Sequence, residues 1–419
     1  MSSPSGQVER RPSQESFAPL LVLLGLAVVI NYVDRGNLSM AAPVIQSELK
    51  LSATQLGVLF SAFFYTYTAL QFVVGGWVDR LGASRVLGAG LLVWSVATIA
   101  MGFSGGFLAL LVLRLLLGIG ESVAFPCTSK VIAQNIPPGN RGLANGVVTA
   151  GLKLGPAVGA FGSGMLIAKY GWRPVFWGMG ISSLLWLPAW WRWRPRQPAT
   201  GESTSAVIGY ARIFGQPLFW GCAAGHFSFN YLSYFFLTWL PLYLAHERGL
   251  SQQELARSAG AYYLVDSASA LLTGWLCDRS IERGARASLV RKAASAGGQV
   301  TAAAAMIACA FATRESYYAW LLVAAVGSGA AGCGVFLFSQ TIAGPRAVGQ
   351  WSALQNGFGN FAGLLGPTLT GFLVDRSGHF FSAFALAAAI TLAGAVVWSF
   401  GVRLEPIDWL RGDERARDA

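Results

Sequence analysis

The stretch Gly75–Arg85 (GGWVDRLGASR) separates two long apolar segments, and a shortened copy of it occurs as Gly274–Arg279 (GWLCDR). The copy follows the original by 199 positions, and the pairs Asn31-Tyr32 and Asn230-Tyr231 have the same spacing. A repeat of this length indicates an internal duplication. We predict two related halves of about six membrane-spanning helices each, in the parallel-repeat arrangement that places a binding site between the halves.

The boundary between the halves is visible in the composition. A further match, Gly155-Pro156 with Gly366-Pro367, has a spacing of 211, which differs from 199 by a loop length. Near Arg192–Gly215 the apolar sequence stops, and prolines, glycine and arginines collect, as in a linker. The predicted organisation is a tail (1–16), a six-helix bundle (17–193), a linker (194–215), a second bundle (216–404) and a second tail (405–419).

The composition is that of a membrane protein. Hydrophobic residues make up 54% of the 419 residues and charged residues 12%, whereas soluble globular chains carry about 25% charged residues. Apolar runs such as Leu20–Ile30 and Ala383–Phe400 recur along the chain, and about twenty such residues span a bilayer as a helix. We predict an all-α integral membrane protein with about twelve spans in two pseudo-symmetric bundles, acting as a monomer in the lipid bilayer.

The net charge of +11 follows the predicted topology and does not indicate nucleic-acid binding. Twenty of the thirty Lys and Arg residues fall in the tails and even-numbered loops, and seven fall in odd-numbered loops. By the positive-inside rule, both tails and the linker face the cytoplasm of a cell whose inner membrane holds the protein. The first apolar segment carries charged residues and no obvious cleavage site, so we expect a retained helix.

The sequence offers little catalytic or metal chemistry. Its three histidines, His226, His246 and His379, are far apart, and its five cysteines have no metal-ligand spacing. A nucleophile–base pair and a phosphate loop are also missing from the sequence. We therefore expect no enzyme, no metal site and no cofactor.

Six ionisable residues fall inside predicted spans, where each ionised group costs about 2.5–3.5 kcal/mol. They must be paired or face water. Arg114 and Glu121 are seven residues apart and share one helix face, whereas the neighbours Asp34 and Arg35 need partners on other helices. Lys153 and Asp266 have opposite signs and can pair with each other. The six are Asp34, Arg35, Arg114, Glu121, Lys153 and Asp266.

These charges suggest a coupling mechanism. Three acids and three bases sum to zero, so protonation of the acids leaves a positive site that attracts an anion. We expect Asp34 and Glu121 to couple proton entry to anion entry. The alternative is that the charges are buried ion pairs that only fix helix packing, although such pairs are weak stabilisers.

The second half supplies neutral hydrogen-bonding groups at related places. The repeat aligns Asp34 and Arg35 with Ser233 and Tyr234, and Asp266 with Tyr67. Amides and hydroxyls suit a polyol or sugar, although each could equally join helices. The candidate groups are Asn230, Tyr231, Ser233, Ser339, Gln355, Asn356 and Asn360.

Two glycine series indicate close helix packing. Gly151, Gly155 and Gly159 recur every fourth residue, and Gly359, Gly363 and Gly366 nearly do so. Small residues at this spacing let helix backbones approach each other in membranes.

The segment after the second span, with its partial copy, resembles the signature loop of the major facilitator superfamily. That resemblance implies that the acids and arginines of the loop latch the cytoplasmic helix ends. The implied gating residues are Asp79, Arg80, Arg85, Asp278 and Arg279.

Three further stretches resemble the anion:cation symporter family of that superfamily, which includes sugar-acid transporters: Asn31–Ser39, Arg114–Pro126 and Asn356–Pro367. The resemblance implies proton sites at Asp34 and Glu121, with Arg35 and Arg114 pairing with them or with a substrate carboxylate. It implies that Tyr32, Tyr67 and Asn360 line the substrate. Lys153 and Asp266 depart from the family pattern, and Lys153 is a possible anion contact.

The expected function is proton-coupled symport of a small organic anion, such as a sugar acid, with protons as the coupling ion. Anion exchange, sodium coupling and phosphate transport stay open, because only tests with ion gradients separate them. A sensor that binds its ligand without moving it is a further alternative.

Overall fold

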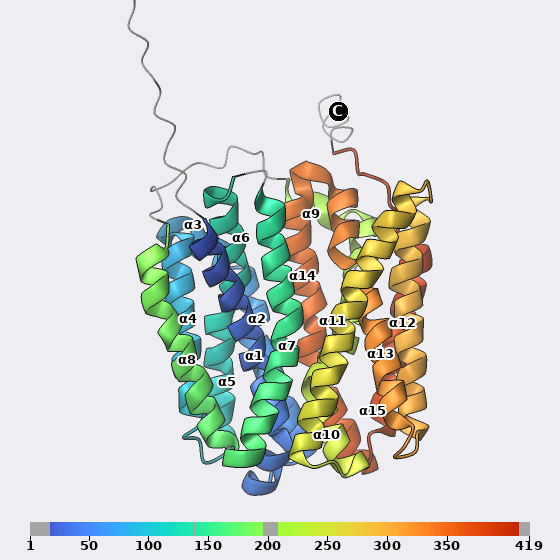
Figure 1. Cartoon of the computed structure of the whole chain (residues 1–419). Helices are drawn as coiled ribbons and strands as arrows, with labels where there is room; N and C mark the ends of the chain where they lie inside the picture. The colour runs from blue at the N-terminus through green and yellow to red at the C-terminus, as the bar shows by residue number, and fades with distance from the viewer. Residues whose placement is uncertain (1–16, 138–139, 196–207, 333, 410–419) are drawn as a thin grey trace, which may run out of the picture.

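The computed structural model describes residues 17–137, 140–195, 208–332 and 334–409. This part of the chain is helical and contains no strand. The helices stand side by side, and the first described helix begins at the same end of the molecule at which the last described segment ends (Figure 1). We call this the terminal end and the opposite one the far end.

Helices of the first half form one bundle, with two spans broken in the middle. Helices α2 and α3 make up one broken span, and α5 and α6 make up the other. The elements are α1 (Ala18–Leu49), α2 (Ala53–Gln71), α3 (Val74–Leu81), α4 (Ala83–Met101), α5 (Phe107–Glu121), α6 (Ala124–Asn135), α7 (Arg141–Tyr170) and α8 (Trp172–Trp193).

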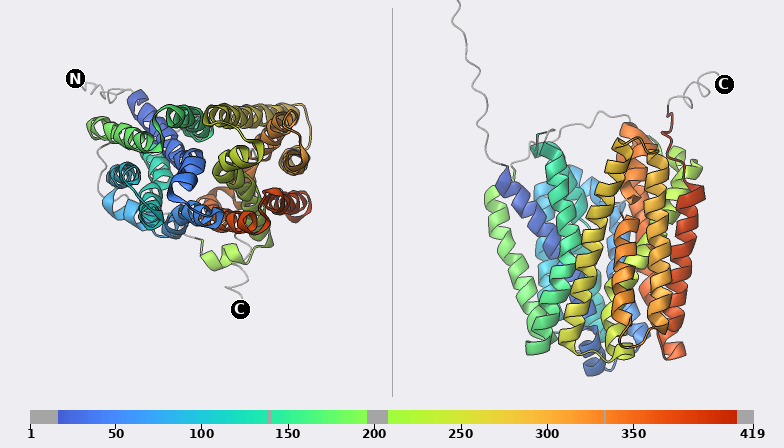
Figure 2. Two further views of the ribbon diagram at one scale, coloured as in Figure 1. Left: turned by 90° about the horizontal axis from the view of Figure 1, so that it is seen from below. Right: turned by 45° about the vertical axis from the view of Figure 1, so that its right-hand side comes forward.

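The second half forms the other bundle, seen beside the first in Figure 2. Within α14, Gly344 has φ 64° and ψ 177°, so the helix turns there and contributes to two spans. The elements are α9 (Tyr210–Phe214), α10 (Pro217–Arg248), α11 (Gln252–Glu282), α12 (Ala287–Phe311), α13 (Tyr317–Gly332), α14 (Val335–Ser377) and α15 (Phe381–Val396), which ends in a π-helical turn, Val397–Gly401.

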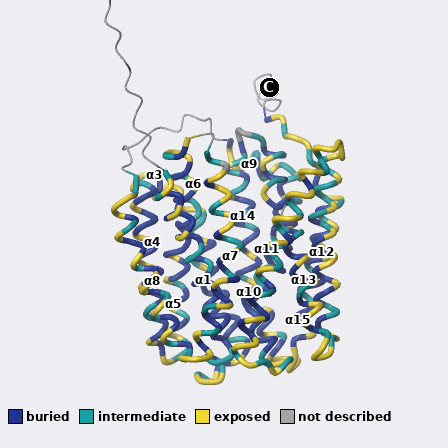
Figure 3. The backbone as a smooth tube through the Cα atoms, viewed as in Figure 1, coloured by how far each residue is buried: buried dark blue, intermediate teal, exposed yellow. Residues whose placement is uncertain are grey.

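The spans agree with the predicted architecture. In the described part of the chain, seven helical segments are long and apolar enough to cross a membrane. More polar helices complete the twelve: α2, α8, α10, α11 and the second limb of α14. Many exposed residues of the spans are large and apolar, such as Leu185 (72% exposed) and Leu271 (69% exposed), whereas the charged residue Glu121 is buried. Buried and exposed residues alternate along the helices (Figure 3). This distribution suits lipid as the surrounding solvent.

The duplication extends to helix termini. Ser52 caps α2 and Ser251 caps α11, 199 positions later, each in a reciprocal capping box. Helices α1 and α10 both have 32 residues and end at left-handed residues with the same spacing, Lys50 (φ 53°) and Gly249 (φ 63°). The repeat therefore describes matching backbone geometry as well as matching sequence.

The glycines of α7 allow it to pack closely against α1, as predicted. A Cβ on Gly155 would lie 2.6 Å from Cβ of Tyr32, and one on Gly159 would lie 3.1 Å from Cα of Val33. In α14, a Cβ on Gly363 would lie 2.4 Å from the ring of Phe64 in α2. Larger residues would push these helices apart.

Hydrogen bonds join the two bundles toward the far end. Oδ1 and Oδ2 of Asp375 in α14 accept hydrogen bonds from the backbone N–H groups of Ala53 (2.9 Å) and Thr54 (2.7 Å) in α2. Oγ of Ser39 donates to the carbonyl oxygen of Thr238 at 3.1 Å. Because the first N–H groups of a helix have no partner within it, a carboxylate is a favourable partner for them.

The predicted gating residues lie at the terminal end. Arg279 contacts Glu282 of its own helix at 3.4 Å, and the side chain of Asp79 lies outside the described side chains. Their role as a latch stays a prediction. The exposed members are Arg80, Arg85, Asp278 and Arg279.

We expect Gly155→Ala to destabilise the protein by about 1–3 kcal/mol, because the new methyl group overpacks the α1–α7 contact. Gly162→Ala is the matched control, since a Cβ there meets no atom within 4 Å; it should be neutral or slightly stabilising. Thermal unfolding in detergent measures both. Equal melting temperatures for the two variants would contradict the close contact.

We expect Asp375→Asn to weaken closure of the far end by about 1 kcal/mol, because the neutral amide interacts less well with the α2 N-terminus. Distances between spin labels placed on the two bundles at the far end should then show a larger fraction of molecules in which the bundles are separated. The control is Glu315→Gln, an exposed acid in the loop between α12 and α13. Unchanged distance distributions would show that Asp375 does not hold the bundles together.

Candidate functional site

A buried ion pair joins α1 to α5. Nε of Arg35 lies 2.7 Å from Oε2 of Glu121, and the two side chains are 3% and 0% exposed. Helix α1 brings Arg35 inward within the polar stretch Asn31–Ser39 of an otherwise apolar helix, and α5 ends at Glu121. Each charge therefore has an opposite charge at hydrogen-bond distance, which a charged group buried in protein requires.

Three aromatic rings surround the Arg35 guanidinium. Its Cζ atom lies 4.9 Å from the ring centre of Tyr32, 4.8 Å from that of Phe63 and 4.6 Å from that of Tyr67. Cation–π contacts strengthen when they are shielded from water, so the rings stabilise a cation at this position. Nη2 of Arg35 and Oε1 of Glu121 are buried without a hydrogen-bond partner among the described residues, so the pair retains polar atoms that can bind another group.

Arg114 lies close by but is bound differently. Its Nε donates a hydrogen bond to the carbonyl oxygen of Leu59 in α2 at 3.1 Å, and its guanidinium is 5.1 Å from the ring of Phe63. Among the described contacts Glu121 pairs with Arg35 and not with Arg114, and the other expected role of Arg114, a contact with a substrate carboxylate, stays a prediction. Buried Nη1 of Arg114 has no hydrogen-bond partner among the described residues.

Asp34 faces a different neighbour from Arg35. Its Oδ1 accepts a hydrogen bond from Nδ2 of Asn37 at 3.2 Å, and its Oδ2 accepts one from Oγ of Ser183 in α8 at 3.5 Å. Asn37 in turn accepts a hydrogen bond from Ser163 in α7 at 2.6 Å. The partner on another helix is therefore a hydroxyl and not an arginine, because adjacent residues of α1 point toward different helices.

Lys153 and Asp266 pair as their opposite signs predicted. Nζ of Lys153 in α7 lies 3.1 Å from Oδ2 of Asp266 in α11, and the side chains are 19% and 13% exposed. Oγ of Ser267 donates a hydrogen bond to the carbonyl oxygen of Lys153 at 2.8 Å. This ion pair joins the two bundles.

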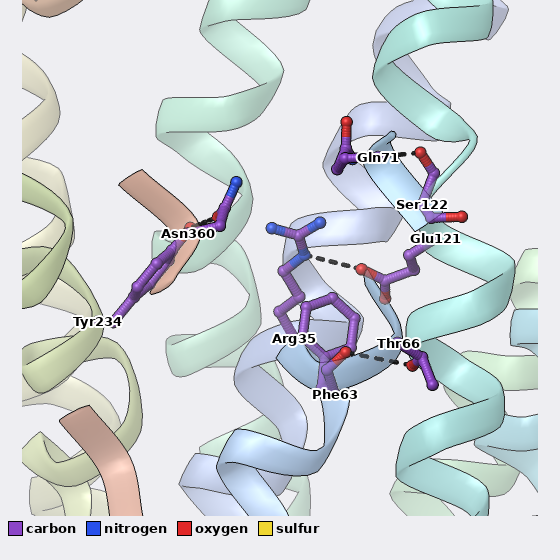
Figure 4. Close-up of polar contacts among 8 residues, drawn as sticks. All are labelled: Arg35, Phe63, Thr66, Gln71, Glu121, Ser122, Tyr234 and Asn360. Atoms are coloured by element: carbon purple, nitrogen blue, oxygen red, sulfur yellow. Dashed lines mark hydrogen bonds and ion pairs between the residues drawn. The ribbon is translucent and has the colours of Figure 1, made fainter. Parts of the chain in front are cut away.

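The second bundle contributes Tyr234 and Asn360. The Tyr234 hydroxyl donates to Oδ1 of Asn360 at 2.6 Å, and Nδ2 of Asn360 donates to the carbonyl oxygen of Asn356 at 2.8 Å. In Figure 4, Arg35 lies between Glu121 on one side and the Tyr234–Asn360 pair on the other. Tyr234 was not among the predicted site residues, although the repeat aligns it with Arg35.

Other candidate residues of the second bundle pack against residues of the same bundle. Oγ of Ser339 donates to Oε1 of Gln355 at 2.6 Å, within the two limbs of α14, so Ser339 does not join the group around Arg35. Tyr231 is buried, and a Cβ on Gly366 would lie 3.2 Å from its ring. Asn230 is buried in α10. The substrate roles of these residues and of Asn356 stay predictions.

Comparisons with known proteins agree with this architecture. A hexuronate transporter of Bacillus subtilis is 31% identical to the chain, over 89% of this chain and 92% of that protein. A probable sulfoacetate transporter of Cupriavidus necator is also 31% identical, over 95% and 96%. The structure of a bacterial homologue of the human lysosomal transporter Spinster has the same fold, with a TM-score of 0.76 at 21% identity over 93% of this chain and 96% of that one.

The family assignment rests on the length of the chain that matches the family model. Residues 24–340, which include nearly all of the first bundle, the linker and much of the second bundle, match the family model of the Major Facilitator Superfamily. Because relatives at 31% identity extend over nearly the whole chain, the assignment covers both bundles. The chain is a membrane transporter that belongs to the major facilitator superfamily.

Proposed function

We propose that the protein is a proton-coupled symporter of a small organic anion, a sugar acid or related carboxylate. The observation that carries the proposal is the buried Arg35–Glu121 pair, facing the Tyr234–Asn360 pair of the other bundle. The relatives named for hexuronate and sulfoacetate, both carboxylates, support an anionic substrate. No cofactor other than the coupling proton is needed.

Glu121 is the proposed coupling acid. When it is ionised, it holds Arg35 at 2.7 Å. When it is protonated, it loses the charge that holds the guanidinium, and Arg35 is available to a substrate carboxylate, bidentately if the geometry allows. The site therefore has the same net charge when it is empty and when it holds one proton and one substrate anion. This equality couples the proton flux to the anion flux. Asp34 is the second proposed proton site.

The substrate is proposed to bind between the bundles. Arg35 and Arg114 supply the positive charge, and Tyr32 and Tyr67 supply ring faces beside it. Tyr234 and Asn360 supply hydroxyl and amide groups that suit substrate hydroxyls. One chain provides both sides of the site, so we propose a monomer as the working unit.

Transport is proposed to occur by alternating access. The bundles are hydrogen-bonded toward the far end in this conformation, and rocking must break these bonds to open that side. The bias of Lys and Arg supports a cytoplasmic terminal end in the inner membrane. Release of the latch at Asp79 and Asp278 is proposed to accompany opening of the terminal end.

We expect Glu121→Gln to retain substrate exchange but to lose accumulation driven by a proton gradient, because the amide mimics a permanently protonated acid. Uptake and counterflow of a panel of sugar acids in proteoliposomes separate the two activities. Exposed Glu405→Gln is the control and should accumulate substrate as the wild type does. Accumulation by Glu121→Gln against a gradient, when only a pH difference is applied, would remove Glu121 as the coupling acid.

We expect Arg35→Lys to raise the KM for the best-transported member of that panel by about tenfold, because lysine keeps the charge but loses the planar fork of donors. Arg35→Ala should abolish saturable uptake. Exposed Arg257→Lys in α11 is the control for the substitution itself. An unchanged KM for Arg35→Lys would argue against a bidentate contact with the substrate.

Exchange of anions and sodium coupling are the alternatives. Both predict that wild-type proteoliposomes show no accumulation when a pH difference is the only gradient. Accumulation that follows a sodium gradient, or that requires a loaded internal anion, would replace the symport proposal.

A further inference from the structure

A chain of hydrogen bonds leads from Asp34 in α1 to α7. Nδ2 of Asn37 donates to Oδ1 of Asp34 at 3.2 Å, and Oγ of Ser163 in α7 donates to Oδ1 of Asn37 at 2.6 Å. The three residues are buried, with an exposure of 2% or less. Asp34 is a proposed proton site, whereas Asn37 and Ser163 have no role in the proposed mechanism so far.

Ser163 determines how the Asn37 amide is oriented. An amide accepts hydrogen bonds at its oxygen and donates them from its nitrogen. Because the oxygen accepts from Ser163, the NH2 group is directed at Asp34. Oγ of Ser183 lies farther from the carboxylate, at 3.5 Å, and makes a shorter bond of 2.8 Å to the carbonyl oxygen of Met179. Asn37 is therefore the main donor to Asp34, and a donor to a carboxylate favours its ionised form.

The charged group that acts on Asp34 from a neighbouring helix is Glu121 of α5. It interacts electrostatically with Asp34, while Nε of Arg35 lies 2.7 Å from Oε2 of Glu121. Two carboxylates that are close together disfavour each other's ionised form. The donor that Asn37 supplies therefore matters most when Glu121 is ionised as well. Two tyrosines on the neighbouring helices α2 and α10 interact with the guanidinium of Arg35: Tyr67 and Tyr234.

The hydrogen bond between α1 and α7 lies beside a contact between the bundles. A Cβ on Gly164, which follows Ser163, would lie 2.6 Å from Cε of Met40 in α1 and 2.6 Å from Cβ of Ala256 in α11. Nε2 of Gln252 in α11 donates to the carbonyl oxygen of Met40 at 2.8 Å. Helix α11 of the second bundle therefore holds α1 and α7 together next to this hydrogen bond for as long as the far end is closed.

We propose that Asn37 and Ser163 are positioning residues that make the proton affinity of Asp34 depend on closure of the far end. The proposal rests on the proposed proton symport and deepens it. With the far end closed, α11 holds α1 against α7, the amide donates to Asp34, and Asp34 releases its proton toward the terminal end. With the far end open, α11 leaves, the amide can turn away, and Asp34 takes up a proton from the far end.

The direction of this change suits symport, because Asp34 then holds its proton less tightly on the side where the proton is released. Such a change requires a contact that differs between the two conformations, and the contact with α11 is one. By linkage, a proton that binds more tightly in one conformation shifts the equilibrium toward that conformation by the same factor. Protonation of Asp34 therefore favours opening of the far end.

The test compares net uptake and counterflow of glucuronate in proteoliposomes. Ser163→Ala and Asn37→Ala should keep counterflow, which needs no deprotonation of the carrier. Both should lower uptake driven by a proton gradient by about tenfold or more, the effect of losing a hydrogen bond to a charged group. The double variant should be no worse than Asn37→Ala, because both residues act through one amide. The control is Ser182→Ala, whose exposed hydroxyl donates to the carbonyl oxygen of Met179 in the same helix.

The internal pH gives a readout that a packing role would not move. Without the amide donor, Asp34 should release its proton only into a more alkaline interior. Raising the pH inside the liposomes by about one to two units should therefore restore net uptake by Ser163→Ala. The wild type should respond much less to the same change.

Distances between spin labels at the far end test the linkage directly. Lowering the pH should raise the fraction of wild-type molecules in which the bundles are separated there. In Ser163→Ala the fraction should respond less to pH, since the hydrogen bond that connects Asp34 to α7 is absent. An equal response in the two proteins would contradict the proposal.

The outcomes separate this proposal from the one on which it rests. Unchanged net uptake in both variants, a loss that internal pH does not restore, or an equal loss of counterflow and net uptake overturns the positioning role and leaves proton-coupled symport standing. Wild-type protein that accumulates neither glucuronate nor sulfoacetate under a proton gradient overturns both.

Discussion

Nε of Arg35 lies 2.7 Å from Oε2 of Glu121, and the two side chains are 3% and 0% exposed. The packing of the other helices depends on keeping these two charges paired inside a membrane. Each alone would cost about 2.5–3.5 kcal/mol in mid-bilayer, and together they neutralise each other. The rings of Tyr32, Phe63 and Tyr67 then fix the guanidinium. Nη2 of Arg35 and Oε1 of Glu121 have no hydrogen-bond partner among the described residues. The pair is therefore suited to exchange one partner for a ligand.

Close helix packing makes this arrangement possible. Glycines on α7 bring its backbone against α1, which carries Arg35, and Gly118 of α5 packs against the carbonyl oxygen of Phe63, where a Cβ would lie 2.3 Å away. Short distances between helices exclude lipid from the polar centre, while large apolar side chains such as Leu185 and Leu271 are exposed on the outside of the helices. The same feature limits sequence change, because a single methyl group at such a glycine displaces a whole helix.

The contacts between the bundles include polar groups as well as close packing. Asp375 accepts hydrogen bonds at the α2 N-terminus and Lys153 pairs with Asp266, while Gly363 of α14 packs against the ring of Phe64 in α2. A rocking motion between the bundles must break and remake these polar contacts. The residues that make these polar contacts belong to different repeats. Whether the contacts are formed therefore depends on the conformation of the whole transporter.

The sequence by itself determined the class, the spans, the two halves and the group of charged residues, because hydropathy, the 199-residue repeat and rare intramembrane charges are local properties of the chain. It also indicated the Lys153–Asp266 pair, since the two charges are opposite in sign. Only the tertiary structure decided that Glu121 pairs with Arg35, that Asp34 faces Ser183, and that Tyr234 joins Asn360 while Ser339 binds Gln355. Helical periodicity fixes which residues share a face of one helix, but the choice of helix that this face meets depends on how all the helices pack together.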